Sequence, residues 1–199
     1  MKKIFLILFL LSLILFSVSL LFFKGSFFYV MALHTGMLSL AMFFLFEKDI
    51  ETTARKLGII GVNKKEILIY TIKGVVAVIA ITLILSLFLA YFHIDDRQKV
   101  VEIANKLPWY IIVFAVVFAP ISEEIFFRVL LVERFGISVS AILFALSHIA
   151  YGSISEIFIV FFIGYAFAFI YKMSKSILPT IFIHFIFNLV SIGIMRLFG

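Results

Sequence analysis

Long apolar runs alternate with short polar segments along the whole chain. A transmembrane helix needs about 20 apolar residues to cross a hydrocarbon core ~30 Å thick, and seven apolar runs of about 14 to 26 residues can be delimited. The pattern therefore predicts an all-α fold, a polytopic transmembrane helix bundle of about seven spans, or eight if a further segment enters the membrane. The predicted spans are 4–23, 27–46, 67–92, 108–132, 137–150, 157–171 and 179–197.

The polar segments between these runs predict turns and surface loops. A tight turn is expected at 24–26, a basic surface loop with a short helix at 47–66, and a polar loop at 93–107. Ser153 or Ser155 is expected to cap the helix of the sixth span, because a serine hydroxyl accepts a hydrogen bond from a free amide of the first turn.

The composition changes the class of protein that must be considered. Hydrophobic residues make up 65% of the 199 residues and charged residues 14%, whereas soluble domains carry about 25% charged residues. A water-soluble globule, a disordered chain and a nucleic-acid-binding protein are therefore excluded, and membrane lipid is the expected surrounding. The chain has no cysteine, which excludes disulfides, thiolate metal ligands and a catalytic thiol.

Lysine and arginine predict the orientation, because cytoplasmic loops collect basic residues. With the N-terminus inside, the inner segments hold about twice as many basic residues as the outer ones. We expect a multi-pass protein of the cell membrane with a cytoplasmic N-terminus. The chain divides into an N-terminal part, 1–107, with three helices and the basic cytoplasmic loop, and a second part, 108–199, that carries the candidate chemistry. The inner basic residues are Lys2, Lys3, Lys48, Arg55, Lys56, Lys64, Lys65, Arg134, Lys172 and Lys175.

A few polar residues lie deep within the predicted spans, where an ionisable group is costly and marks a candidate functional site. They gather in three of the seven runs. His34, in the second run, we interpret as a hydrogen-bonding link between helices. The deep polar residues of the three later runs are Glu123, Glu124, Arg128, His148, His184 and Asn188.

Helical spacing relates these residues to one another. Glu124 and Arg128 are four residues apart with the acid first, so they share a helix face and are expected to form an ion pair. Glu123 points about 100° away and has no partner in its own helix. His184 and Asn188 are also four apart and form one polar stripe.

The depths of the polar residues agree across three predicted helices. Glu123 and His148 each lie 11 residues, or roughly 16 Å, from the predicted inner end of their span. His184 lies 9 residues, or roughly 14 Å, from Lys175 at the same surface. We therefore expect these side chains to converge on one site about half way through the membrane.

A carboxyl, two imidazoles and an amide are suited to hydrolysis. Glu123 can take a proton from water, and histidine and asparagine can orient that water or donate to a developing oxyanion. The set Glu123, His148 and His184 could instead bind a divalent metal such as zinc, since two histidines and a carboxylate are a known catalytic zinc set. No cofactor is certain from the sequence. The H-E-x-x-H helix, a carboxylate pair of two aspartates within the spans and the G-x-S-x-G elbow are absent.

Three short motifs resemble those of one family. Glu123-Glu124-Ile-Phe-Phe-Arg128 is similar to the EExxxR motif of the CPBP intramembrane proteases, the CAAX proteases and bacteriocin-processing enzymes also called Abi. Phe144-Ala-Leu-Ser-His148 resembles their FxxxH motif, and the segment 184–188 resembles their HxxxN motif. The resemblance covers roughly 108–197.

The resemblance implies an intramembrane endopeptidase that hydrolyses a peptide bond of a membrane-associated protein or peptide. It implies that Glu123 is the general base, that His148 helps to activate water, and that His184 and Asn188 form the oxyanion hole. Eukaryotic members cleave prenylated CAAX proteins, whereas many prokaryotic members are linked to bacteriocin immunity or peptide maturation.

The resemblance leaves the metal question open, because members are described both as metalloproteases and as glutamate-dependent enzymes. It gives Glu124 and Arg128 a supporting role. Val129 stands where the family often has glycine, which bears on helix packing at that point and not on the chemistry. Two alternatives remain: a non-catalytic bacteriocin-immunity or membrane scaffold protein, and a proton-coupled transporter. The transporter is disfavoured because the chain shows no inverted repeat.

Overall fold

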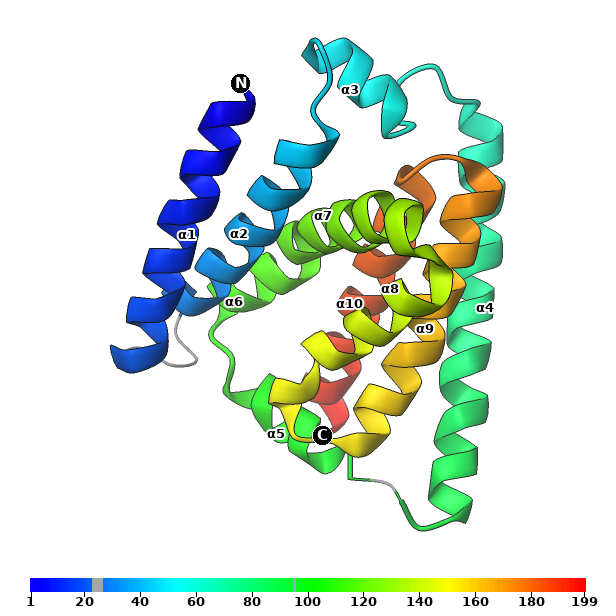
Figure 1. The fold of residues 1–199 in the computed structure, drawn as a ribbon. Coiled ribbons are helices and arrows are strands. Elements are labelled where there is room, and N and C mark those ends of the chain that lie inside the picture. Colours follow the sequence, from blue (N-terminus) through cyan, green and yellow to red (C-terminus); the bar gives the residue numbers. More distant parts are fainter. Residues whose placement is uncertain (23–26, 95) are drawn as a thin grey trace.

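The computed structural model describes residues 1–22, 27–94 and 96–199, and every regular element within them is helical (Figure 1). The predicted all-α bundle is therefore confirmed. The turn expected at 24–26 lies outside the described residues. The elements are α1 (Lys2–Phe22), α2 (Phe27–Leu45), α3 (Ile50–Lys56), α4 (Lys64–Tyr91), α5 (Gln98–Lys106), α6 (Trp109–Val113), η1 (Phe114–Phe118), α7 (Ala119–Glu124), η2 (Ile125–Val132), α8 (Glu133–Ser147), η3 (Ile149–Tyr151), α9 (Ile154–Ser174) and α10 (Leu178–Phe198).

Six helical stretches of the described chain are long and apolar enough to cross a membrane. The predicted fourth and fifth spans fall within one of them, Trp109–Tyr151, which is 43 residues long. This stretch is not straight, because Gly136 has φ 84° and ψ 174°, a conformation that glycine adopts at little cost. The chain folds back there, so that α8 packs against η2. The part of α8 beyond Gly136 is too short to cross a bilayer alone.

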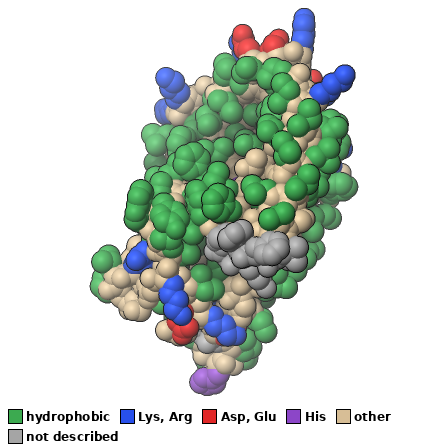
Figure 2. All heavy atoms as spheres, turned by 90° about the vertical axis from the view of Figure 1, so that its left-hand side faces the viewer, with side chains coloured by type: hydrophobic (Ala, Val, Ile, Leu, Met, Phe, Trp, Pro, Cys, Tyr) green, Lys and Arg blue, Asp and Glu red, His purple; other side chains and the backbone are tan. Residues whose placement is uncertain are grey.

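The helices form a bundle, and different elements lie at its two ends (Figure 1). The N-terminus and α3 lie at one end, and α5 and the C-terminus lie at the other. The α1–α2 pair forms one side and α4 the opposite side, where α4 packs against α9 and α10. On the face formed by the α1–α2 side, hydrophobic side chains cover the middle and charged side chains gather toward the two ends (Figure 2). This distribution suits a surface surrounded by lipid.

Side-chain caps define several helix starts. Ser153 Oγ accepts a hydrogen bond from the Glu156 amide (3.1 Å), as the sequence predicted for α9. Asp49 and Asn63 cap α3 and α4 in the same way. The segment 93–107, predicted only as a polar loop, contains the short helix α5.

One part of the buried core lies between η2, α8 and α9. Phe144 and Phe167 are fully or nearly fully buried there. Gly164 permits this packing, because a Cβ atom at that position would lie 2.8 Å from Phe144 Cδ1. Gly164 and Ala168, four residues apart in α9, are both buried, and small residues at this spacing permit close helix packing. Arg128 and His148, described next, lie against the Phe144 ring in this region.

Candidate active site

A cavity of about 430 Å³ opens between helices from both halves of the chain. Its walls include the four residues predicted to be catalytic, Glu123, His148, His184 and Asn188. His34 of α2 also lines it. The expected convergence of three helices on one site is therefore present, and a fourth helix joins them.

Glu123 faces this cavity with its charge-bearing atoms largely unsatisfied. Its Oε2 atom is buried and has no hydrogen-bond partner among the described residues. His184 Nε2 lies 3.8 Å from Oε2, and His34 Nε2 lies 3.8 Å from Oε1. Both distances exceed hydrogen-bonding range. The carboxyl thus has two imidazole nitrogens nearby and room for a reactant.

Glu124 has the opposite surroundings. Arg128 Nε donates to Glu124 Oε2 (2.8 Å) and Nη2 donates to Oε1 (3.3 Å), and both side chains are fully buried. The ion pair predicted from the spacing is therefore confirmed. The guanidinium carbon also lies 4.5 Å from the centre of the Phe144 ring and 5.4 Å from that of Phe167. Aromatic faces attract a cation, so the pair sits in a closed, well-packed environment.

All three histidines around the cavity use Nδ1 in the same way. His184 Nδ1 donates to Glu124 Oε1 (3.0 Å), and His148 Nδ1 donates to the Phe144 carbonyl (2.9 Å). Each acceptor fixes the tautomer, because a carbonyl and an arginine-paired carboxylate only accept. Nε2 is then the nitrogen left for chemistry.

His34 is a member of the site that the sequence prediction assigned only to helix linkage. The Ser122 hydroxyl donates to the Ala119 carbonyl (3.0 Å) and accepts from His34 Nδ1 (2.8 Å). His34 therefore does link α2 to α7, and its Nε2 also faces Glu123. Its depth could have revealed this role, since His34 lies about as far into its span as Glu123.

Asn188 makes a bond that the motif did not predict. Its Nδ2 donates to the Ala115 carbonyl (2.9 Å) in the π-helical segment η1. Within η1 the Ala119 amide bonds to the Phe114 carbonyl, five residues back. The same register would pair the Ala115 carbonyl with residue 120, which is proline and has no N–H. Asn188 supplies the missing donor and keeps a second N–H for the cavity.

The possible metal set consists of Glu123, His148 and His184. Imidazoles held through Nδ1 by a carboxylate or carbonyl are typical of metal sites. In the described part of the chain, however, no three histidine, aspartate or glutamate side chains are grouped closely enough to hold an ion. Metal binding by Glu123, His148 and His184 therefore stays a prediction.

The helix α5 forms an apolar wall of the cavity. Val100, Ile103 and Ala104 of α5 and the following Leu107 line the space, and α10 lines it with further apolar side chains. Asp96, just before α5, accepts hydrogen bonds from Ser153 Oγ (2.7 Å) and the Ile154 and Ser155 amides (3.0 and 3.1 Å). These bonds lower the pKa of Asp96, the Ser153 bond most. They attach α5 to the start of α9.

Comparison with known proteins supports one family. Residues 105–190 match the family model described as "Type II CAAX prenyl endopeptidase Rce1-like". No curated protein and no solved structure matches the chain. The matched segment contains the three motifs and excludes His34. Over residues 105–190 the chain is therefore similar to the Rce1-like type II CAAX prenyl endopeptidases, which confirms the resemblance to the CPBP intramembrane proteases.

Proposed function

We propose that this protein is an intramembrane endopeptidase of the CAAX-protease type. Its substrate is a membrane-associated protein or peptide with a CAAX-like, prenylated end. The family match implies intramembrane proteolysis. The cavity supports a prenylated substrate, because Ile103, Leu107 and Met195 give it apolar walls. These walls lie beside the carboxyl and imidazole side chains that hydrolysis needs.

One observation carries the proposal: Glu123 lines a cavity with three histidines, and its buried Oε2 atom has no hydrogen-bond partner among the described residues. A water molecule bound beside it loses a proton to Glu123 as its oxygen bonds to the substrate carbonyl carbon. His148 Nε2 accepts the other hydrogen of that water and orients it. The proton on Glu123 then passes to the leaving amine as the C–N bond breaks.

The oxyanion is stabilised by donors at the same cavity. Asn188 has one amide hydrogen beyond the one bonded to Ala115. His184, which is held through Nδ1 by Glu124, is the second residue of the proposed oxyanion hole. Positioned donors of this type contribute about 10²–10³ in rate. No step in this scheme uses a metal ion, and dependence on zinc is tested by comparing turnover before and after dialysis against a chelator.

The membrane arrangement is part of the proposal. The end that carries the N-terminus, α3 and the turn after α9 holds most of the inner basic residues. We assign it to the cytoplasmic side by the positive-inside rule.

The test is cleavage of farnesylated and unprenylated CAAX peptides by the purified protein in proteoliposomes, followed by mass spectrometry. Glu123→Gln is expected to reduce turnover at least 10³-fold with the thermal unfolding midpoint preserved. Glu102→Gln, on the exposed side of α5 and outside the cavity lining, is the matched control and is expected to keep wild-type turnover. Unchanged turnover in Glu123→Gln would overturn the mechanism.

The scaffold alternative has a different outcome. If the protein is non-catalytic, no peptide is cleaved by the wild type, and alanine at Glu123 or His148 lowers only stability.

A further inference from the structure

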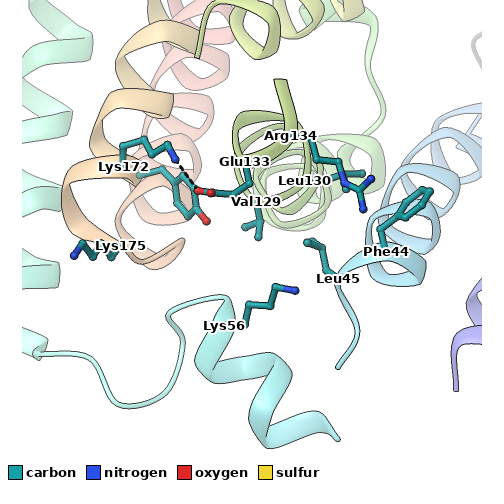
Figure 3. Close-up of a pocket in the computed structure, with 10 residues that line it drawn as sticks. Phe44, Leu45, Lys56, Val129, Leu130, Glu133, Arg134, Lys172 and Lys175 are labelled. Atoms are coloured by element: carbon teal, nitrogen blue, oxygen red, sulfur yellow. Dashed lines mark hydrogen bonds and ion pairs between the residues drawn. The ribbon is translucent and has the colours of Figure 1, made fainter. Parts of the chain in front are cut away.

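A second cavity, of about 510 Å³, lies at the end of the bundle where α3 meets the turn between α9 and α10 (Figure 3). It shares no lining residue with the candidate active site. Its walls combine basic side chains with apolar ones. None of the roles proposed above uses it.

Four cations and one carboxylate line this second cavity. Lys172 is paired with Glu133 (3.1 Å), and Lys56 is paired with Glu47, which lies outside the lining. Arg134 and Lys175 have no carboxylate partner among the described residues. The Arg134 guanidinium lies 4.3 Å from the centre of the Phe44 ring, which orients the group without neutralising it. The cavity therefore keeps an excess of positive charge.

The position of Lys175 is set by the backbone. Lys175 has φ 53°, and its amide donates to the Tyr171 carbonyl (2.9 Å). The next two residues tie the turn to the end of α3: Ser176 Oγ donates to the Gly58 carbonyl (2.5 Å), and the Ile177 amide donates to the Leu57 carbonyl (3.1 Å). This connection places Lys56 and Lys175 at the same cavity, although they come from distant parts of the sequence.

The opposite wall is apolar and reaches the surface of the bundle. Leu45, Val129 and Leu130 are buried at the cavity, while Phe44 is 42% exposed on α2. A soluble anion would gain little from such a wall. A phospholipid has a phosphate for the cations and acyl chains for the apolar side.

We propose that this cavity binds the phosphate headgroup of an anionic membrane phospholipid. In the orientation proposed above it faces the cytoplasmic leaflet, which is rich in anionic lipid. Arg134 and Lys175, which lie on opposite sides of the cavity (Figure 3), attract the phosphate, since their charges are not engaged by carboxylates. Glu133 opposes binding and keeps Lys172 occupied when the site is empty.

The test measures lipid binding to the purified full-length protein in neutral detergent and does not depend on proteolysis. Native mass spectrometry and the thermal unfolding midpoint are followed as phosphatidylglycerol, phosphatidylcholine or inorganic phosphate is added. Phosphatidylglycerol is expected to be retained and to raise the midpoint. The double variant Arg134→Gln with Lys175→Gln is expected to weaken phosphatidylglycerol binding about tenfold.

Two further variants make the result decisive. Lys64→Gln with Lys65→Gln removes the same charge at the start of α4, outside the cavity lining, and is expected to leave binding unchanged. Glu133→Gln is expected to strengthen binding several-fold, because it removes the opposing carboxylate and frees Lys172. The proposal is overturned by equal retention of phosphatidylcholine, by inorganic phosphate binding as well as the lipid, or by equal losses in the two double variants.

Discussion

Glu123 and Glu124 are adjacent in the chain, yet they belong to two different regions. The region around Glu124 is closed: Arg128 and His184 bind a carboxylate with no exposed surface, and two phenylalanine rings pack against the Arg128 guanidinium. The region around Glu123 is open, with a cavity in front and imidazole nitrogens just beyond hydrogen-bonding distance. A step of one residue, about 100° around the helix, thus separates a carboxylate held by its partners from one left free for a reactant.

Contacts in the closed region orient a side chain of the open region. Glu124 holds His184 through Nδ1, so the stable ion pair with Arg128 decides which nitrogen of His184 faces Glu123. An active group must be poorly satisfied before substrate binds, and its neighbours must then be held by other contacts. We therefore expect mutations in the closed region to reduce stability most, and mutations in the open region to reduce activity most.

The largest stability effect is expected from Arg128→Met, which breaks the closed region. It leaves the Glu124 carboxylate buried without its partner, and breaking a buried pair costs about 3–5 kcal/mol. Thermal or denaturant unfolding in detergent measures the change. Adding Glu124→Gln to this variant is expected to restore part of the stability, because no charge then remains to be desolvated. A cost below about 1 kcal/mol for Arg128→Met would show that the region is less closed than its burial indicates.

The ion pair of the closed region was predictable from the sequence, because it depends only on the spacing of two residues in one helix. A separation of four residues places Glu124 and Arg128 on one helix face whatever surrounds them. The depths of Glu123, His148 and His184 were predictable for a similar reason, since each depends only on helical rise from a membrane boundary.

Contacts that depend on helix packing were not predictable in this way. The depth of His34 places it level with Glu123, but its contacts with Ser122 and Glu123 follow from the placement of α2 against α7, which spacing within either helix does not define. The fold-back at Gly136 depends on the backbone angles of that residue, whereas the sequence showed only two apolar runs separated by a short break. The bond of Asn188 to the Ala115 carbonyl depends on a π-helical turn.

The next largest effect concerns Asn188, which stands between the two regions. Asn188→Ala removes the side-chain donor of the Ala115 carbonyl, and a buried carbonyl left without a donor costs about 1–3 kcal/mol. Pro120→Ala supplies a backbone N–H at the position where the π-helical register requires one. The cost of Asn188→Ala is therefore expected to shrink in the Pro120→Ala background. Additive costs in this double-mutant cycle would contradict the account of η1.

A smaller effect, mainly on activity, is expected at His34 in the open region. His34→Asn keeps an amide donor for Ser122 and removes the nitrogen that faces Glu123, and we expect turnover to fall about tenfold with stability preserved. His34→Ala removes both interactions and is expected to lower stability by about 1 kcal/mol as well. His93→Asn, in the exposed loop after α4, is the matched control. If His34→Asn keeps the turnover and pH profile of the wild type, His34 only links α2 to α7 and takes no part in activity.

The smallest effect is a pH-dependent one at the wall of the open region. Hydrogen bonds from Ser153 and from the Ile154 and Ser155 amides hold the pKa of Asp96 below its usual value, so the ionised form stabilises the attachment of α5. A carboxyl with a lowered pKa contributes its stability above the unfolded-state value of about 3.9, and the contribution is lost as the pH falls below it. Asp96→Asn is therefore expected to lower the unfolding midpoint slightly at pH 7, and the difference from wild type should close below about pH 4. Glu102→Gln, in the same helix, is expected to show no such convergence. A difference that stays constant with pH would mean that the Asp96 charge plays no part in holding α5, and that the wall of the cavity depends on packing alone.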